Sequence, residues 1–413
     1  HKGGRALPTL VRHNSTVKET EMTSRIDGEP DLHEEADRDS PMRRWRIITA
    51  FLALLAMAVI LLWVPVPFVV SSPGPTFNVL GSANGEPMIA IEGTDPTTGE
   101  EVQLDDAQSA SVTAKAKPGQ GQLRMVTVSE SGGPGNRLNF AQLLMAYFDS
   151  HSKIVDYESV YPSGTTYNEI SDAQSAMMRN SQTTSQVAAL EYLGWDVPAT
   201  VTIEGATEGS NADGIVQQGD ILQAITTPDG TRHEITHASL PFTLMRTVPA
   251  GSRMTLTIER DGVVRDVSFD SIAASATESG SKLGIYLSVT PELPVDISFN
   301  LDGVGGPSAG MMFSLGIIDR LTPGDMTGGN AIAGTGTMSF DGQVGPIGGI
   351  QQKMWGAHDD GAQWFLAPSD NCSEVVGHVP DGLRVVKVSN LSEAATAVAT
   401  IAEGNGATLP TCQ

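Results

Sequence analysis

The chain is poor in three kinds of side chain. Aromatic residues make up only 5% of its 413 residues, there are two cysteines, and 25 basic residues stand against 48 acidic ones. The resulting net charge of −23 repels nucleic acids and anionic lipids, so neither is an expected partner. No G-x-x-x-x-G-K-[ST] phosphate-binding loop occurs, and the cysteines lack the spacing of a metal site. We therefore expect no ATP, no metal and no other cofactor. The 44 glycines instead indicate a body rich in turns and strands.

The first 70 residues divide into a polar part and an apolar part. Residues 1–41 carry many charges of both signs and few apolar clusters, which predicts a disordered tail. Residues 42–70 are uncharged from Ile47 onward and are long enough to cross a bilayer as one helix. We therefore predict a transmembrane signal anchor. The alternative is a cleaved signal peptide, although no A-x-A-like cleavage site follows.

Basic residues set the expected orientation of this anchor. Three arginines (Arg43, Arg44 and Arg46) precede the apolar stretch, and the next basic residue is Lys115. The positive-inside rule therefore places the N-terminus in the cytoplasm and residues 71–413 outside a cell membrane that the chain crosses once. Cys372 and Cys412 then both lie where disulfides persist. A bridge that pins the C-terminal tail (405–413) is favoured, and two isolated thiols are the alternative.

Residues 71–190 mix turns with regular elements. Gly121–Ser129 has the β-branched, alternating pattern of a strand, while Leu138–Ser150 and Asp172–Leu193 have apolar residues at helical spacing. We expect this N-terminal part of the ectodomain to contribute a strand to the sheet of the C-terminal domain.

Short strands follow and end in a hairpin whose turn is Asp261-Gly262. Residues 191–272 resemble a PDZ domain, through YLGW, ADGIVQQGDILQAI and GSRMTLTIERDG. The resemblance implies that Leu193, Gly194 and Trp195 form a loop whose backbone N–H groups bind the C-terminal carboxylate of a peptide, which adds to the sheet as a strand. The alternative is that this domain only packs against its neighbour and binds no peptide.

The stretch Asp302–Ser314, DGVGGPSAGMMFS, surrounds one serine with the smallest residues just before an apolar helix. A serine hydroxyl is a poor nucleophile unless a base takes its proton and backbone N–H groups stabilise the oxyanion that forms. Glycines at 305 and 306 would let a peptide backbone approach Ser308, and the helix would direct its positive N-terminal end at the site. The alternative is an ordinary helix N-cap.

No histidine beyond residue 70 lies in a recognisable catalytic triad, and no G-x-S-x-G elbow is present. The candidate base is Lys353, one turn into a helix that Gly348-Gly349 opens, with apolar neighbours. Burial there would lower its pKa from about 10.4 into the range of roughly 7–8 that a base needs. The alternative is a lysine whose stem lies on an apolar surface while its amine reaches water.

Residues 280–404 resemble the proteolytic domain of the Lon family, which uses a serine–lysine dyad. The resemblance rests on GGPSAG, AGTGTMSFDGQVGPIGGIQQK and AHDDGAQWFLAP. It implies an α+β fold with the PDZ domain inserted, Ser308 as the nucleophile and Lys353 as the general base. Thr335 would orient the lysine, or would simply end a strand. Lon-type domains commonly form rings, so a homo-oligomer is implied as well.

Two departures from the ATP-dependent Lon proteins refine this expectation. Gly305 stands where those proteins have an aspartate, and no ATPase module is present. The chain therefore looks like a bacterial membrane-anchored, ATP-independent Lon-like serine endopeptidase acting on extracytoplasmic or membrane-associated proteins. The PDZ resemblance implies that such substrates can bind through their C-termini. The alternative is a membrane-tethered PDZ peptide-binding protein whose peptidase domain is inactive or structural.

One motif suggests different chemistry. His233-Glu234-Ile235-Thr236-His237 spells H-E-x-x-H, which on a helix would offer two zinc ligands and a base. A Pro-Asp-Gly turn ends three residues earlier and a proline follows at 241, so we expect no helix and no zinc site there.

Overall fold

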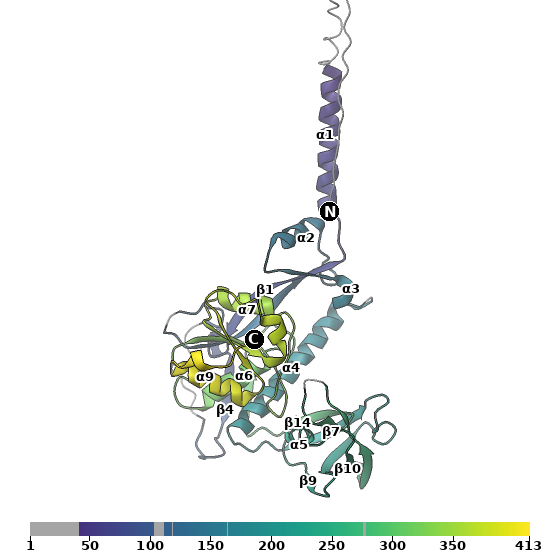
Figure 1. Cartoon of the computed structure of the whole chain (residues 1–413), viewed down its shortest axis with the longest axis vertical. Coiled ribbons are helices and arrows are strands. Elements are labelled where there is room, and N and C mark those ends of the chain that lie inside the picture. The colour runs from purple at the N-terminus through teal and green to yellow at the C-terminus, as the bar shows by residue number, and fades with distance from the viewer. Residues whose placement is uncertain (1–40, 103–110, 118, 163, 276–277) are drawn as a thin grey trace, which may run out of the picture. The chain divides into compact units, whose positions relative to one another are not determined.

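The computed structural model describes residues 41–102, 111–117, 119–162, 164–275 and 278–413 (Figure 1). The predicted tail therefore lies, up to residue 40, outside the described residues. The chain divides into two units, one ending at Leu61 and one beginning at Leu62. The described part of the first unit is helix α1 (Pro41–Leu62), in which no residue is buried. Its 22 residues extend about 33 Å at 1.5 Å per residue, enough to cross a bilayer by length and composition.

The second unit contains a six-stranded main sheet. Its strands lie in the order β20-β19-β16-β5-β1-β6. They are Arg384–Val388, Trp364–Pro368, Ala331–Gly334, Gln122–Ser131, Phe68–Asn78 and Lys153–Asp156, respectively. The pairs among β20, β19, β16 and β5 are parallel, whereas β1 pairs antiparallel with β5 and β6. The strand predicted at Gly121–Ser129 thus lies between β1 and β16, and β16 follows it by about 200 residues in the chain.

Alternate side chains of the main sheet enter two different cores. Leu123, Met125 and Ile332 pack with helices α4 (Tyr167–Tyr192), α6 (Gly310–Leu321) and α9 (Leu391–Ala402). Val126, Ala333 and Phe365 pack on the opposite face, with α7 (Ile350–Asp359) and α8 (Cys372–Val375). This alternation is the period-two pattern of a strand buried on both faces. The fold is a mixed α/β arrangement of helix, sheet and helix layers.

A second sheet with its own core lies between α4 and α6 in the chain. Its order is β11-β10-β8-β7-β14, with β9 paired to β8. The strands are Val263–Asp270, Arg253–Arg260, Asp220–Thr226, Ala199–Ala206, Ile285–Pro291 and, for β9, Arg232–Glu234; helix α5 covers Leu240–Met245. The sequence-based boundary at 280 assigned residues 285–291 to the C-terminal domain. The structure differs, because β14 pairs along its length with β7.

Smaller elements complete the second unit. Helices α2 (Phe140–Phe148) and α3 (Tyr157–Val160) flank β6 in the chain. Short ladders join β4 (Ile89–Gly93) to β15 (Val295–Phe299), β17 (Thr337–Met338) to β18 (Val344–Gly345), and two further pairs, β2 (Ser82–Ala83) to β3 (Glu86–Pro87) and β12 (Ile272–Ala273) to β13 (Ser281–Lys282). Cys372 and Cys412 form a disulfide, the alternative favoured from the sequence.

Candidate active site

Ser308 lies in the loop that leads into α6, two residues before the helix begins. Its backbone carbonyl accepts a hydrogen bond from Gly336 N at 2.9 Å, and the carbonyl of Pro307 accepts one from Ser181 Oγ of α4 at 3.1 Å. The loop is therefore held from both sides. Since the N–H groups of a helix's first turn have no partner inside the helix, the start of α6 presents donors and the positive end of its dipole beside Ser308.

The glycines around Ser308 have separate physical causes. Gly306 has φ +89°, a backbone conformation that favours glycine. A Cβ on Gly305 would lie 2.7 Å from Gln174 Cβ of α4, and one on Gly310 would lie 2.8 Å from Met338 Cβ. Gly305 also lines the cavity that contains Ser308, so packing against α4 is a second reason for glycine at this position. Position 305 thus has α4 packed against it, whereas Gly306 meets nothing within 4 Å.

Lys353 is buried on α7. The helix follows Gly349, whose left-handed backbone (φ 69°) lets a chain turn into the helix while Val128 lies where a Cβ would point. Lys353 is only 3% exposed and lies beside the apolar core that contains Val126 and Met354. Burial lowers the pKa of the Lys353 amine from 10.5 to about 8. At neutral pH roughly a tenth of the molecules then carry an uncharged amine that can accept a proton.

Thr335 connects the two segments. Lys353 Nζ donates to Thr335 Oγ1 at 3.3 Å, and Thr335 Oγ1 donates to the backbone carbonyl of Ser308 at 3.1 Å. Ser308 and Lys353 line one cavity of about 580 Å³. Within the described part of the chain, no hydrogen bond joins Ser308 Oγ directly to Lys353 Nζ; catalytic hydrogen bonds are often long before substrate binds.

The hydroxyl of Thr335 makes a testable contribution. In Thr335→Val the amine of Lys353 loses its acceptor, so we expect kcat/KM for peptide cleavage to fall roughly 10²-fold. Since the hydroxyl also stabilises the charged amine, its loss lowers the pKa of Lys353, and the pH midpoint of the rate moves below about 8. Thr335→Ser keeps the hydroxyl and should keep most of the activity. An unchanged midpoint in Thr335→Val would limit Thr335 to a structural part.

One side of the cavity is a strand with an open edge. β5 pairs with β16 only from Gln122 to Met125, but it continues beside β1 as far as Ser131. The intervening residues, Val126–Ser131, line the cavity together with Ser308 and Lys353. A peptide in extended conformation could therefore add to this edge, with main-chain hydrogen bonds holding it across the serine.

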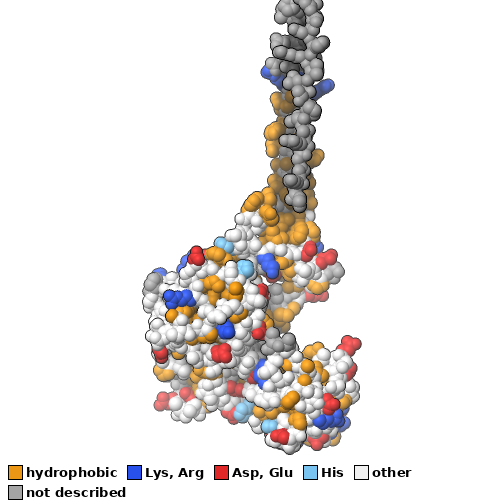
Figure 2. Space-filling model, in the orientation of Figure 1, with side chains coloured by type: hydrophobic (Ala, Val, Ile, Leu, Met, Phe, Trp, Pro, Cys, Tyr) orange, Lys and Arg blue, Asp and Glu red, His pale blue; other side chains and the backbone are white. Residues whose placement is uncertain are grey.

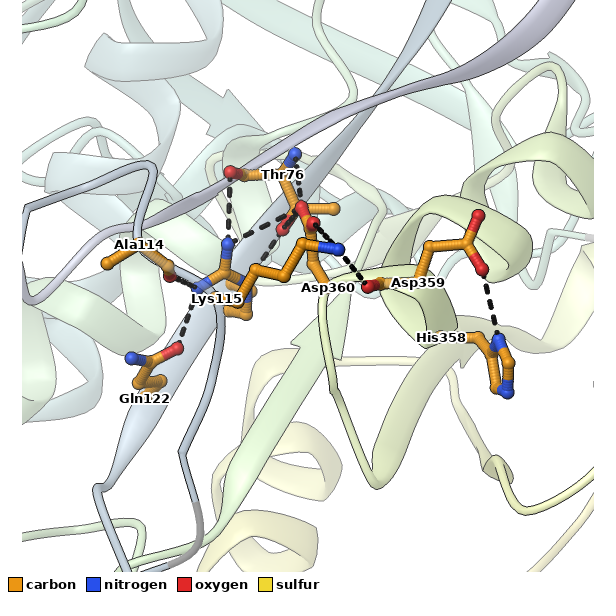
Figure 3. Close-up of polar contacts among 8 residues, drawn as sticks. Thr76, Ala114, Lys115, Gln122, His358, Asp359 and Asp360 are labelled. Atoms are coloured by element: carbon orange, nitrogen blue, oxygen red, sulfur yellow. Dashed lines mark hydrogen bonds and ion pairs between the residues drawn. The ribbon is translucent and has the colours of Figure 1, made fainter.

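A buried polar network fixes the C-terminal end of α7 (Figure 3). The fully buried Arg124 of β5 donates to Thr76 Oγ1 at 2.7 Å and to the Ala114 carbonyl at 2.7 Å, and its guanidinium lies 3.6 Å from the carboxylate of Asp360. Asp360, which ends α7, also accepts from Thr76 Oγ1 at 2.8 Å. Burial lowers the pKa of Arg124, and Asp360 opposes that shift. The network holds the helix that carries Lys353 against β1 and β5, and no motif in the sequence indicates it.

The triplet predicted to bind a peptide carboxylate lies at the C-terminal end of α4. Leu193, Gly194 and Trp195 end α4, and their backbone N–H groups donate to the carbonyls of Ala189, Glu191 and Leu190. The three donors are thus used within the helix end, so the prediction of a carboxylate-binding loop there is wrong. A similar triplet, Leu283-Gly284-Ile285, lies beside a cavity of about 470 Å³ and leads into β14, the edge strand of the second sheet.

The H-E-x-x-H motif does not form a helix. His233 and Glu234 lie in β9, whereas His237 lies beyond it and contacts Asp196 at 3.2 Å. Over the described ranges, no group of three His, Cys, Asp or Glu side chains could hold a metal ion.

The part of the chain that contains Ser308 and Lys353 is similar to known proteins. Residues 250–400 match the family model of the Lon protease (S16) C-terminal proteolytic domain. A segment is 31% identical over 155 residues to the Lon protease of Brucella suis biovar 1, covering 35% of this chain and 18% of that protein. Another comparison gives 33% identity over 103 residues with Lon protease 2 of Bacillus subtilis, covering 24% of this chain and 18% of that protein. The chain thus contains a Lon-type proteolytic domain, and this domain supports a serine peptidase. The matched segments span about a fifth of the length of these relatives.

Proposed function

We propose that this chain is an ATP-independent, membrane-anchored serine endopeptidase that uses Ser308 and Lys353 as a catalytic dyad. The observation that carries the proposal is the buried amine of Lys353, with its pKa near 8, in the same cavity as Ser308 and linked to it through Thr335. A lysine buried only for structural reasons would have no cause to share a cavity with a serine at a helix N-terminus.

The reaction follows from this arrangement. Ser308 Oγ attacks the carbonyl carbon of the scissile bond while its proton passes to the uncharged Lys353 Nζ. Backbone N–H groups at the start of α6 stabilise the oxyanion of the tetrahedral intermediate. The ammonium then gives its proton to the leaving amine, and the C–N bond breaks to leave an ester on Ser308. Water attacks this ester while Lys353 takes its proton; the C–O bond to Ser308 then breaks, the acid product leaves, and Lys353 returns the proton to Ser308 Oγ.

Substrates are flexible protein segments. The sequence contains no phosphate-binding loop, so unfolding by ATP hydrolysis is not part of the proposal. An extended segment binds along Val126–Ser131 of β5, in the cavity that contains the dyad. Exposed tails, loops and damaged proteins can adopt this conformation without prior unfolding.

Helix α1 anchors the enzyme. Its length and composition suit a bilayer, and the arginines at its start place the N-terminus in the cytoplasm and the catalytic domain outside. A helix near the N-terminus that serves only as a signal sequence has the same length and composition. Recovery of the full-length chain in the membrane fraction separates the two cases.

The second sheet recruits or gates substrates as a PDZ domain. Its peptide groove lies between α5 and the free edge of β14, and Leu283-Gly284-Ile285 takes the place that the sequence analysis gave to residues 193–195. The groove adjoins Asp341, which pairs with Arg246 at the end of α5. A peptide C-terminus in this groove would therefore bind close to the β17–β18 connection. This connection contains Asp341, which follows Thr335 by six residues in the chain.

The groove also supports a second candidate function, a membrane-tethered peptide-binding protein with an inactive peptidase domain. One experiment distinguishes the two. The full chain in detergent is incubated without ATP with an unstructured protein substrate, and separately with a fluorophosphonate that labels reactive serines. We expect cleavage and labelling of Ser308 by the wild type and neither by Ser308→Ala. Equal cleavage by both proteins would refute the dyad, and a folded wild type that neither cleaves nor reacts would favour the binding protein.

A further inference from the structure

We propose that α2 (Phe140–Phe148) is an interfacial helix that lies in the boundary region of the membrane, with its bulky apolar side chains among the lipid acyl chains. The proposal rests on the membrane anchor of the proposed function. It goes beyond that function because it gives the catalytic domain a second contact with the lipid surface, in addition to the anchor.

Helix α2 exposes most of its large apolar side chains, an arrangement that is unfavourable in water. Five of its six large apolar or aromatic side chains have exposed fractions of 41–77%: Phe140, Leu144, Met145, Tyr147 and Phe148. The smaller side chains Ala141 and Ala146, with Leu143, are the half-buried ones. No residue of the helix is buried and none is charged. Hydrophobic side chains gather over this helix on the face shown in Figure 2. A continuous patch of this kind indicates an interaction surface.

The helix is firmly built despite this exposure. The N-cap Asn139 accepts from Gln142 N at 2.9 Å, and Gln142 Oε1 accepts from Asn139 N at 3.0 Å, which completes a capping box. The outward direction of the five side chains is therefore set by regular helix geometry and not by a loosely held loop.

The chain itself ties α2 to the membrane surface. Phe140 N donates to the carbonyl of Val64 at 3.1 Å, and Val66 N donates to the carbonyl of Leu138 at 2.8 Å. Val64 lies two residues beyond Leu62, the last residue of α1, and two residues span at most about 7 Å. If α1 crosses the bilayer, α2 must begin close to the point where the chain leaves it. Trp63, also exposed, is a residue type favoured at that boundary.

The occupant of the patch is lipid and not a second copy of the chain, because α2 begins at a backbone hydrogen bond to Val64, two residues beyond the last residue of the proposed anchor. Peripheral helices of this kind bury their apolar face about 5–10 Å into the boundary region. The attraction is hydrophobic, since the ectodomain is strongly acidic and α2 has no basic residue. Zwitterionic phosphatidylcholine should therefore suffice.

Contact between α2 and the membrane would also determine which substrates reach the cavity. The cavity that contains Ser308 extends to Gly132, and a Cβ there would lie 2.6 Å from the carbonyl oxygen of Phe68. Phe68 is six residues beyond the end of α1. Six residues span at most about 20 Å, so if α1 crosses the bilayer, this end of the substrate cavity lies within about 20 Å of the lipid surface, within reach of juxtamembrane segments of other membrane proteins.

The test uses the full chain in phosphatidylcholine vesicles. Met145→Cys, Phe148→Cys and the control Val264→Cys, an exposed apolar site on β11, are each labelled with an environment-sensitive fluorophore, and the native disulfide is kept intact. With brominated lipid we expect the labels at 145 and 148 to lose roughly half their emission and the label at 264 to keep it.

Three outcomes would overturn the proposal. The labels on α2 could be as accessible to aqueous iodide as the label at 264. They could be shielded without bromine quenching and only at high protein density, which would assign the patch to a second copy of the chain. Finally, all variants could fail to float with the vesicles. That result would refute both the membrane anchor and the membrane contact of α2. The peptidase activity would still be tested separately by the Ser308 experiment.

Discussion

Replacing Lys353 with methionine should abolish peptide cleavage and at the same time make the folded protein more stable at pH 7. Without the base, we expect kcat/KM to fall by about 10³–10⁴-fold. Methionine fills a similar volume in the apolar surroundings of Lys353 without a charge to bury. The measurement is steady-state cleavage of an unstructured substrate together with denaturant unfolding of the same preparations.

The sign of the stability change follows from the pKa. The unfolded chain keeps its proton on this lysine up to pH 10.5, whereas the folded chain keeps it only up to about 8. The unfolded state therefore binds more protons between these values, and the folded state loses stability as the pH falls from 10.5 to 8. Below pH 8 the cost is about 3 kcal/mol. Part of it is offset by the hydrogen bond to Thr335, so we expect Lys353→Met to gain roughly 1–3 kcal/mol at pH 7.

The matched control is Lys387→Met, on an exposed position of β20. Its activity and stability should change little, because an exposed surface substitution is usually worth less than about 0.5 kcal/mol. A Lys353→Met enzyme that cleaves as fast as the wild type would contradict the dyad. If Lys353→Met is inactive but less stable than the wild type, the buried charge of Lys353 does not destabilise the folded protein, contrary to our prediction.

Arg124→Met should lower the free energy of unfolding by about 3–5 kcal/mol, because it leaves a buried polar network without its donor. The carbonyls of Thr76 and Ala114 and the amide oxygen of Gln122 lose the hydrogen bonds that the guanidinium donates, and Asp360 loses its buried counter-charge. We also expect slower cleavage, since Asp360 ends the helix that carries Lys353. Denaturant unfolding and cleavage kinetics measure the two effects.

Arg253→Met provides the comparison. Arg253 and Asp270 form an exposed ion pair at 3.2 Å, which is shorter than the 3.6 Å between Arg124 and Asp360. Exposed pairs contribute about 0–1 kcal/mol despite good geometry, because water screens them. If the two substitutions destabilise the chain equally, burial is not what makes the Arg124 network important.

The residues of the proposed site could be selected from the sequence because each belongs to a short local motif. The serine segment, the lysine one turn into its helix and the threonine between them are short motifs whose neighbours in the chain are also their neighbours in space. The structure links Lys353, Thr335 and Ser308 by hydrogen bonds. The disulfide was favoured because both cysteines lie beyond the predicted anchor, on the side of the membrane where disulfides persist.

What the sequence could not predict depends on distant contacts. Gly305 was interpreted as space for substrate, but its small size also accommodates Gln174 of α4, more than a hundred residues earlier. Arg124 reads as an ordinary strand residue, and nothing nearby in the sequence shows that Asp360 will meet it. The apolar spacing of Leu138–Ser150 correctly indicated a helix, yet periodicity alone does not say whether a core or a membrane covers the apolar side.

The error at Leu193–Trp195 has a similar origin. A hydrophobic-Gly-hydrophobic triplet fits both a carboxylate-binding loop and a helix C-terminus, where glycine takes the left-handed conformation. Gly194, with φ +81°, does the latter. The second triplet, Leu283-Gly284-Ile285, was assigned to the next domain because the pairing of β14 with β7 joins strands about 80 residues apart.

The reaction of Ser308 with a fluorophosphonate, followed as a function of pH, tests the account most directly. If an uncharged amine at Lys353 activates the serine, the second-order rate constant of labelling should rise with pH around a midpoint near 8 and level off above it. The same curve should be lost in Lys353→Met. A midpoint near 10.5, or identical pH curves for wild type and variant, would contradict the proposed dyad.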